Sequence, residues 1–428
     1  MVIVGAGYTG LWTAYYLARA RPSLRIVVLE RETAGFGASG RNGGWVSGFF
    51  SGPARVYERG GAGASYAQLQ RAMFDTVEQV AAVLGEHEIG ADFVKGGHLA
   101  LALGPAQARH LREEVAAARG YGVDEADLGE ISAEQLAPRL RVAGAVGATF
   151  SPHVARVHPV KLLTGLAEIV GRLGVSIHER TPVSEIRPHE ALTPFGTVRA
   201  RWIVRATEGY TASLRGLKRA LVPMNSSMII TEPLAPASWE EIGWQGSEVI
   251  GDSAHVYVYL QRTADGRIAI GGRGVPYRFA SRTDGHGETA AATIASLREK
   301  LSSMFPAAAG TPVDHAWSGV LGVPRDWCMS VDADPRTGLA WAGGYVGEGV
   351  AAANLAGRTL RDLIIGERTS LTELPWVGRA PSRWEPEPLR WPAIRGVYSL
   401  YRTADRIERR TGRPSRLGHL VDAASGRA

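Results

Sequence analysis

The first thirty residues constrain the fold of this chain more than any other stretch. Residues 2–31, VIVGAGYTGLWTAYYLARARPSLRIVVLER, read as a short apolar strand, a glycine turn, a helix and a second apolar strand over residues 25–29. The turn carries Gly5, Gly7 and Gly10 in the spacing G-x-G-x-x-G, and the second strand ends at Glu30. This order of elements, glycines and acid is typical of a βαβ unit that binds a dinucleotide.

Each of these residues has a physical task in such a unit. Gly5 makes the tight turn, Gly7 lets a pyrophosphate approach the backbone, and Gly10 lets the helix pack closely on the strand. The free N–H groups at the start of the helix attract the pyrophosphate. Glu30 is placed to accept hydrogen bonds from the adenosine ribose, and the neighbouring Arg31 belongs to the same candidate site.

The glycine-rich stretch that follows points to the same ligand. Residues 35–45, GFGASGRNGGW, hold five glycines and no aliphatic side chain larger than alanine, so they cannot build a core. Such a backbone either turns with positive φ or lies very close to another molecule. Because the stretch follows the βαβ unit directly, we expect it beside the bound dinucleotide.

Length and composition narrow the class of protein. A chain of 428 residues favours two domains, because single cores stop growing near roughly 250–300 residues. Cys328 is the single cysteine, which excludes a disulfide within the chain and fits a reducing compartment. We see no secretory signal before the first strand and no run of transmembrane length, so we expect a cytoplasmic protein without a membrane span.

The net charge of +6 comes almost entirely from arginine. The densest basic run is YRTADRIERRTGRPSR in residues 401–416, and it contains acids as well. A solvated helix face is the favoured interpretation of this run, with nucleic-acid binding as the alternative. We predict no metal site from the sequence.

Hydrophobic spacing outlines two interleaved domains. Helices are predicted over residues 65–90, 105–120, 159–173 and 289–305, with Ser132 as the N-cap of a further short helix. Strands are predicted over residues 96–103 and 175–179 and in a segment ending at Ala206, while residues 216–325 read as a mostly antiparallel sheet. We assign residues 1–92, 152–215 and 326–368 to the nucleotide domain. Residues 93–151 and 216–325 form the substrate domain, and residues 369–428 form a tail with a basic helix.

On these motifs the chain resembles the FAD-dependent amine and amino-acid oxidases related to D-amino-acid oxidase, glycine oxidase and sarcosine oxidase. The resemblance covers roughly residues 1–368 and adds the segments VHP…GLAEIVGRLGVSIHERTPVSEI…IVRAT and GLAWAGGYVGEGVAAANLAGR. The form GASGRNGG is most similar to the gamma-glutamylputrescine oxidase branch. The implied fold class is α/β plus α+β, with a discontinuous Rossmann-like FAD-binding domain and an inserted, mostly antiparallel β-sheet substrate domain.

The resemblance also implies which residues contact FAD. Ser39 and Arg41 are expected at the phosphates or the ribityl chain, and Asn42, Gly43 and Gly44 against the isoalloxazine ring. The backbone of Val183 is expected at the adenine, with Ala206 and Thr207 on the adenosine side. The glycines before the last helix of the nucleotide domain are expected at the pyrimidine part of the flavin: Gly343, Gly344, Gly347 and Gly349.

The implied reaction is oxidation of a C–N bond. A hydride leaves the carbon beside an uncharged amine nitrogen for flavin N5, and the iminium product hydrolyses, so no protein acid or base is obligatory. Glycine oxidase-like relatives hold a substrate carboxylate with an arginine in a turn. The corresponding stretch WSGVLGVPRDW has Val320 and Leu321 there, and Arg325 lies further on. We therefore expect an amine or a larger, modified amino compound, in an aromatic pocket formed by Trp45, Tyr257, Tyr259, Trp317 and Tyr345.

Two details of the cofactor chemistry follow from the same resemblance. Cys328 comes too late in the chain for a flavin-linking cysteine and Trp45 stands where relatives place a linking histidine, so we expect non-covalent FAD. Relatives activate oxygen with a lysine at a position near Ala269, where Arg273 is the nearest cation here. We expect O2 as the electron acceptor. The alternatives are an FAD dehydrogenase with another acceptor, a biosynthetic flavoenzyme acting on a C–C or C–O bond, and a non-enzymatic FAD-binding subunit.

Overall fold

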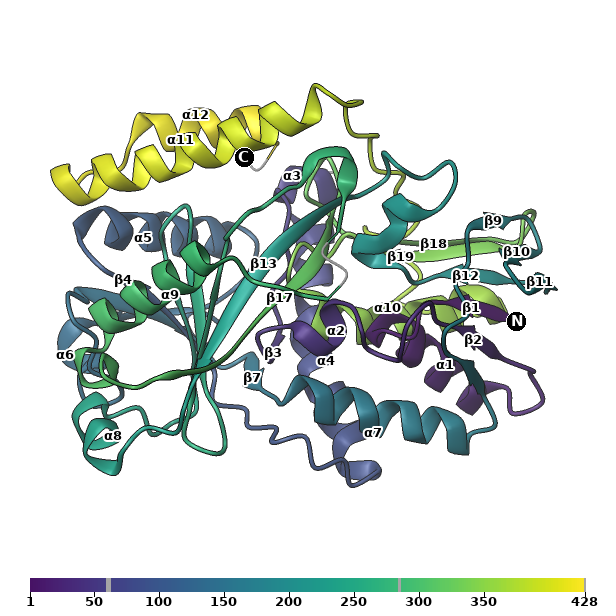
Figure 1. Cartoon of the computed structure of the whole chain (residues 1–428), viewed down its shortest axis with the longest axis horizontal. Coiled ribbons are helices and arrows are strands. Elements are labelled where there is room, and N and C mark those ends of the chain that lie inside the picture. The colour runs from purple at the N-terminus through teal and green to yellow at the C-terminus, as the bar shows by residue number, and fades with distance from the viewer. Residues whose placement is uncertain (59–62, 284–285, 427–428) are drawn as a thin grey trace.

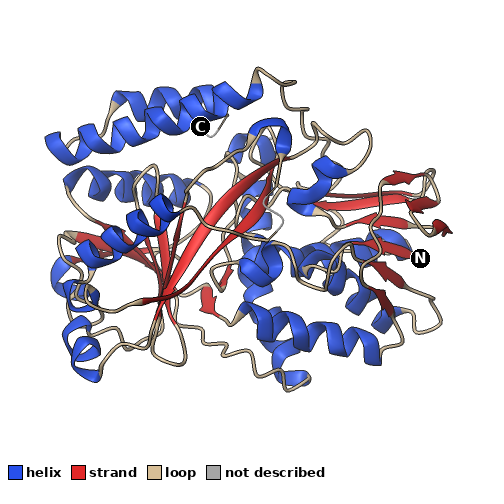
Figure 2. Cartoon of the chain, in the orientation of Figure 1, coloured by secondary structure: helices blue, strands red, loops and turns tan. Residues whose placement is uncertain are grey.

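Two β-sheets lie side by side in the computed structural model, which describes residues 1–58, 63–283 and 286–426 (Figure 1). The sheet near the N-terminus has six strands, and the other sheet has eight. Figure 2 shows their strands as two separate groups, with helices around and between them. The chain is therefore built from α/β and α+β parts, as the sequence predicts.

The six-stranded sheet forms around the first strand. Its order is β18 (Ser330–Asp334), β19 (Leu339–Gly343), β12 (Ile203–Arg205), β1 (Val2–Val4), β2 (Val27–Leu29) and β8 (Ser176–His178). All neighbours are parallel except β18 and β19. The carboxyl ends of β1, β2 and β12 therefore meet at one edge, where open parallel sheets bind ligands.

Strand alternation decides what covers each face of this sheet. Ile3 packs into the cluster that contains Leu11 and Trp12 of α1 (Tyr8–Ala20), whereas Val2 and Val4 pack on the other side with Ala191. That second side is covered by a small sheet of β9 (Glu185–Arg187), β10 (Glu190–Thr193) and β11 (Gly196–Arg199).

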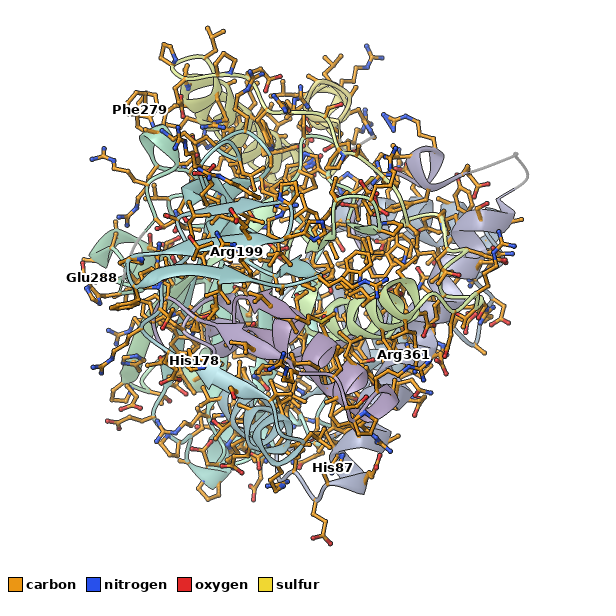
Figure 3. All side chains as sticks on the ribbon, turned by 90° about the vertical axis from the view of Figure 1, so that its right-hand side faces the viewer. His87, His178, Arg199, Phe279, Glu288 and Arg361 are labelled. Carbon is orange, nitrogen blue, oxygen red and sulfur yellow. The ribbon has the colours of Figure 1, made fainter. Side chains whose placement is uncertain are left out.

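Three further helices share the core of this domain. α10 (Gly349–Ile365) and α7 (Pro159–Arg172) pack on α1, and α4 (Ala64–Glu86) packs on α10. A Cβ atom on Gly357 of α10 would lie 2.7 Å from the backbone of Trp12, so glycine allows the close approach of α10 to α1. Figure 3 views this domain end-on, with His178 of β8, Arg199 of β11 and Arg361 of α10 labelled.

The eight-stranded sheet carries the second core. Its order is β17 (Val313–Val323), β13 (Val222–Thr231), β16 (Ile268–Gly272), β15 (Val258–Arg262), β14 (Val249–Asp252), β4 (His98–Ala102), β6 (Gly147–Ser151) and β5 (Gly129–Ser132). Only β14 and β4 pair in parallel. The helices that accompany it are α5 (Pro105–Gly120), α6 (Ala133–Leu136), α8 (Pro236–Ile242) and α9 (Ala291–Met304).

Short elements link the two halves of the molecule. They are α2 (Ala38–Arg41), β3 (Trp45–Ser47), α3 (Ala54–Tyr57) and β7 (Val154–Arg156). β3 pairs with β7 in an isolated two-stranded ribbon, with Trp45 opposite Arg156. After β3 the chain returns to the nucleotide domain as α4, whose buried residues share the core of α1, and it first enters the eight-stranded sheet at β4.

The tail folds back over the substrate domain. It forms α11 (Arg390–Thr411) and α12 (Arg416–Ser425), which lie across the top of Figure 1 above α5 and α9. Trp384 and Tyr398 are buried in a cluster with Val222 and Val323. Among the described residues, no helix is both long enough and apolar enough to cross a membrane.

Most local predictions match these elements, and one is wrong. The predicted helices correspond to α4, α5, α7 and α9, and Ser132 caps α6 in a reciprocal capping box with Gln135. Val320 and Leu321, however, do not form a turn. They lie in β17, which pairs with β13 from Val222↔Val323 to Thr231↔Val313, because pairing with a distant strand extends this segment. The predicted domain boundaries follow the two sheets and stay a prediction.

Candidate functional site

A pocket, which we call the nucleotide pocket, lies at the carboxyl edge of the six-stranded sheet. It encloses about 1140 Å³ of empty space, including its opening to solvent. Of the residues predicted to bind FAD, the following line it: Gly5, Gly7, Glu30, Arg31, Ser39, Asn42, Val183, Ala206, Thr207, Gly347 and Gly349.

The glycine turn explains how the backbone reaches this pocket. Gly5 has a φ of +107°, and a Cβ atom there would lie 2.5 Å from the carbonyl oxygen of Ala206. A Cβ atom on Gly10 would overlap the carbonyl oxygen of Gly5. The first glycine therefore permits the turn, and the third permits the contact between helix and strand.

Ser39 also lines the pocket and contacts the first turn of α1. Its Oγ accepts a hydrogen bond of 2.9 Å from the backbone N–H of Tyr8, the first residue of the helix. A Cβ atom on Gly7 would lie 2.8 Å from that Oγ. Gly7 therefore leaves room for the hydroxyl of Ser39 beside the helix N-terminus. The partial positive charge at that N-terminus favours an anion nearby.

Glu30 is held rigidly at the end of β2. Its Oε2 accepts a hydrogen bond of 2.8 Å from the N–H of Ala6, and its Oε1 accepts one of 3.0 Å from the N–H of Glu32. Each carboxylate oxygen retains acceptor capacity on the pocket side. The carboxylate is thus oriented before any ligand arrives.

An aromatic residue shapes the pocket on the same side. The guanidinium of Arg31 lies 5.3 Å from the ring centre of Tyr210, and both residues line the pocket. The hydroxyl of Tyr210 is buried and has no hydrogen-bond partner in the described part of the chain. Buried polar atoms of this kind are satisfied by a ligand or by water.

Glu208 is a pocket residue that the sequence did not single out. Its Oε1 accepts hydrogen bonds from the N–H groups of Gly344 and Tyr345, at 2.9 and 3.0 Å. Burial raises the pKa of Glu208 to about 7, although these N–H groups and Arg205 oppose the shift. Its Oε2 lies against the backbone of Gly322, and a hydrogen bond from that backbone also opposes the rise in pKa. Glu208 also has a φ of +39°, which is uncommon for a residue other than glycine.

Residues 42–45, which we call the ring segment, connect the pocket to the substrate sheet. The side chain of Asn42 donates to the carbonyl of Ser39 and accepts from the N–H of Gly44. Gly43 and Gly44 do not line the nucleotide pocket. A Cβ atom on Gly43 would lie 2.8 Å from Cε2 of Tyr259, and Gln261 donates to the carbonyl of Gly43 at 2.9 Å.

Arg41, directly before the ring segment, contacts both domains. Its guanidinium stacks on Phe36 at 4.3 Å from the ring centre, and a Cβ atom on Gly287 would lie 2.9 Å from its Nη1. That nitrogen is buried without a hydrogen-bond partner in the described chain. Trp317 donates from Nε1 to the carbonyl of Arg41 at 3.0 Å. Arg41 and Trp317 therefore meet at the domain junction and are not among the residues that line the nucleotide pocket.

The remaining candidates gather on the substrate sheet. Trp45 packs edge-on against Tyr259, with ring centres 6.0 Å apart, and Tyr259 hydrogen-bonds Ser226 at 2.8 Å. Tyr257 and Arg273 line a second cavity, between the substrate domain and α11. Burial works against the charge of Arg273, but Tyr398, Tyr257 and Tyr259 outweigh it and raise the pKa of the guanidinium.

Glu348 is a second acid that the sequence analysis missed. It stands at the N-cap of α10, between two of the predicted cofactor glycines. Burial raises the pKa of Glu348, opposed by a hydrogen bond with Ser47 and by the charge of Arg273. Its place inside the glycine turn GYVGEGV is the sequence signal that would have found it.

Three other predicted residues have different surroundings. Tyr345 lines the nucleotide pocket, and its hydroxyl lies 3.1 Å from that of Thr9, so it faces α1 and not the substrate sheet. Gly344 does not line the pocket and donates to Glu208. Arg325 forms an ion pair of 2.9 Å with Glu385 in the tail.

Cys328 is buried away from the nucleotide pocket. A Cβ atom on Gly52 would collide with its Sγ, and burial raises the pKa of the thiol to about 12. The thiolate that forms covalent bonds is therefore scarce at neutral pH.

Comparison with known proteins agrees with this geometry. The family described as FAD dependent oxidoreductase (DAO) matches residues 1–363. The probable oxidoreductase OrdL of Haemophilus influenzae is 28% identical over 389 residues, covering 87% of this chain and 84% of the relative. The gamma-glutamylputrescine oxidoreductase of Escherichia coli is 28% identical over 375 residues, covering 85% and 83%. The crystal structure of glycine oxidase from Geobacillus kaustophilus superposes with a TM-score of 0.72 at 21% identity, over 88% of this chain and 97% of that structure.

The residues of the nucleotide pocket fit FAD. The N-terminus of α1 and Ser39 offer a polar, positively polarised surface for a pyrophosphate, and Glu30 offers oriented acceptors for a ribose. The buried hydroxyl of Tyr210, which has no partner among the described residues, provides a further polar contact. A bound FAD would thus meet groups that the protein has already oriented, together with the Tyr210 hydroxyl, which has no partner in the described part of the chain.

Proposed function

Because the chain belongs to the FAD dependent oxidoreductase family, we propose that it oxidises the C–N bond of an amine or a modified amino compound. The observation that carries this proposal is the ring segment. Asn42 lines the nucleotide pocket, while Gly43 and Trp45, in the same segment, pack on Tyr259 of the substrate sheet. One short backbone stretch therefore separates the cofactor site from a group of aromatic side chains.

The protein would bind FAD without a covalent link. No cysteine or histidine occurs among the described residues that line the nucleotide pocket, and the thiol of Cys328 is buried elsewhere. Bound FAD would supply a two-electron acceptor for the hydride from the carbon next to the substrate nitrogen. The protein positions both partners and excludes water.

Several observations favour an amine over a plain α-amino acid. A relative that is 28% identical is named gamma-glutamylputrescine oxidoreductase. Arg325, a candidate carboxylate ligand, is paired with Glu385 in the tail. The aromatic rings of Trp45, Tyr257 and Tyr259 suit an aliphatic or cationic substrate body. Glu348, Ser47 and Arg273 would orient its polar end.

The test is anaerobic mixing of the flavin-loaded protein with a panel of primary, secondary and acylated amines and of amino acids. Loss of the oxidised flavin absorbance with an amine, and not with simple α-amino acids, is the expected result. Bleaching by α-amino acids alone would contradict the substrate class. If no amine bleaches the flavin but a compound with a reactive C–O or C–C bond does, the biosynthetic alternative would replace the proposal.

We place oxygen as the electron acceptor, with Arg273 as the cation that stabilises superoxide. Ala269, near which the family resemblance places a lysine, is buried in β16. Arg273→Met should slow reoxidation of the substrate-reduced protein far more than its reduction. The control is Arg402→Met, because Arg402 is an exposed arginine whose Nη2 donates to the carbonyl of Gly274. Rapid reoxidation of the flavin that is unaffected by Arg273→Met would refute the role of Arg273. If air reoxidises the reduced flavin slowly and an artificial electron acceptor does so faster, the protein is a dehydrogenase.

A further inference from the structure

Three potential metal ligands meet where the tail helices cover the substrate domain. His110 lies on α5, His255 in the connection between β14 and β15, and Glu408 on α11. Their ligand atoms all lie within 4.8 Å of one another. The tail helices cover α5 at this point (Figure 1), so segments far apart in the sequence converge here.

The distances in this His–His–Glu cluster suit a tetrahedral cation. Oε1 of Glu408 lies 3.1 Å from Nε2 of His255 and 3.5 Å from Nε2 of His110. Two ligands bound to Zn²⁺ at about 2.0–2.1 Å in tetrahedral geometry are separated by about 3.4 Å. The contact to His110 is too long for a strong hydrogen bond, yet both imidazoles direct Nε2 toward the same oxygen.

The surroundings hold the three side chains in place. Nδ1 of His110 lies 3.5 Å from the carbonyl of Ser253, an acceptor that would fix the Nδ1–H tautomer and leave Nε2 free to bind a metal. The ring of Tyr401 stacks on His255 at 5.4 Å and 14°. Oε1 of Glu408 also accepts a hydrogen bond of 2.8 Å from the N–H of Ser415.

Burial and access are also appropriate for a metal site. The side chains of His110, His255 and Glu408 are 19%, 13% and 5% exposed, so the cluster is largely shielded from water. Glu408 is the member of the cluster that lines the cavity between α11 and the substrate sheet, so a cation would reach the cluster from the side of this carboxylate. Five basic side chains line the same cavity: Arg273, Lys300, Arg402, Arg406 and Arg409. The three arginines of α11 are exposed, so water screens their charge, and Lys300 is paired with Asp252 at 2.8 Å.

We propose that His110, His255 and Glu408 bind a divalent transition-metal cation of the zinc class, with water as the fourth ligand. Two imidazoles and one carboxylate are a known zinc ligand set. The metal would join α5, the substrate sheet and α11, and so fasten the tail to the domain that carries Tyr257 and Arg273. This site is independent of the oxidation chemistry proposed above.

The test is calorimetric titration of the untagged, flavin-loaded protein with Zn²⁺ after dialysis against a chelator. The expected result is one equivalent of zinc per chain. His110→Ala, His255→Ala and Glu408→Gln should each weaken binding by more than about tenfold, because loss of a partner outside the ligand shell already costs that much. Glu408→Gln keeps an acceptor for Ser415 and a similar volume, and the flavin spectrum reports whether each variant is folded.

His419→Ala is the matched control, because His419 is exposed on the tail helix α12 and belongs to no part of the cluster. It should bind zinc like the unaltered chain. Zinc should also slow tryptic cleavage of the arginine-rich tail in the unaltered chain and not in Glu408→Gln. Zinc binding that is absent, or unchanged by all three replacements, would overturn the site and leave the cluster as a hydrogen-bonded contact.

Discussion

The substitution Glu208→Gln tests the electrostatics of the nucleotide pocket. Glu208 has an ordinary pKa of 4.5, and burial raises its pKa to about 7 in the folded chain. Below pH 4.5 the carboxyl is neutral in the folded and unfolded chains alike and burial has no electrostatic cost. Above pH 7 it is charged in both, and the folded chain carries the full cost of the buried charge. The unaltered protein should therefore lose stability through this group as the pH rises from 4.5 through 7.

The size of the effect follows from the pKa difference. One pKa unit corresponds to about 1.36 kcal/mol, so a shift from 4.5 to about 7 amounts to about 3 kcal/mol of unfolding free energy at pH 8. Glutamine is neutral at every pH and retains an oxygen that can accept from Gly344 and Tyr345. The stability of Glu208→Gln relative to the unaltered chain should therefore increase with pH by about this amount.

The assay is urea unfolding of the flavin-free protein at four pH values between 5 and 8, followed by far-UV circular dichroism. The quantity compared is the difference in unfolding free energy between the two proteins at each pH, because other titrating groups then cancel. Glu32→Gln is the control, since it removes an acid at the pocket rim whose side chain is 45% exposed. A free-energy difference that stays constant with pH, or falls as pH rises, would refute the reasoning.

Three further predictions concern the glycine turn, the ribose acid and the tail. Gly10→Ala should abolish folding or FAD retention, because its Cβ would overlap the Gly5 carbonyl. The control Gly171→Ala on α7 should be neutral or stabilising, because no atom lies within 4 Å of the added Cβ. Expression level and flavin content are measured for both variants. Glu30→Ala should weaken FAD binding by about 1.5–3 kcal/mol, the usual worth of a charged hydrogen bond, measured by fluorescence titration, and unchanged affinity would contradict its role. Arg325→Ala should leave amine turnover and flavin content unchanged. It should lower the free energy of unfolding by at most about 1 kcal/mol, because the ion pair with Glu385 is partly exposed. A selective loss of turnover would show that Arg325 binds substrate.

The elements that could be predicted from the sequence are those whose structure depends on residues close together in the chain. The βαβ unit, the cap at Ser132 and the helices α5 and α7 depend on apolar spacing and on residues a few positions apart. The segment at Val320 and Leu321 was misread as a turn because its conformation depends on β13, about a hundred residues earlier in the chain. Strand pairing at that distance leaves no local signal.

Side-chain direction at the site was equally out of reach of the sequence. Arg41 follows the glycine turn in the chain, yet its guanidinium is directed by Phe36 and by Gly287, a residue of the substrate domain. Glu208 and Glu348 gain their raised pKa values from burial by segments far along the chain. His110, His255 and Glu408 are separated by about 150 residues at each step, so no ligand spacing is visible.

The contacts of the ring segment with a cofactor stay a prediction, because its glycines have a second role in the packing of the two domains. Tyr259 occupies the space into which a Cβ atom of Gly43 would project, and Val157 and Gln261 do the same at Gly44. These glycines are therefore needed for the two domains to meet, whether or not a flavin is bound. An alanine at Gly43 would displace Tyr259 in the protein without a cofactor as well as in the loaded protein. Loss of activity in Gly43→Ala would consequently report on domain packing, and only a variant that spares Tyr259 can report on the flavin contact.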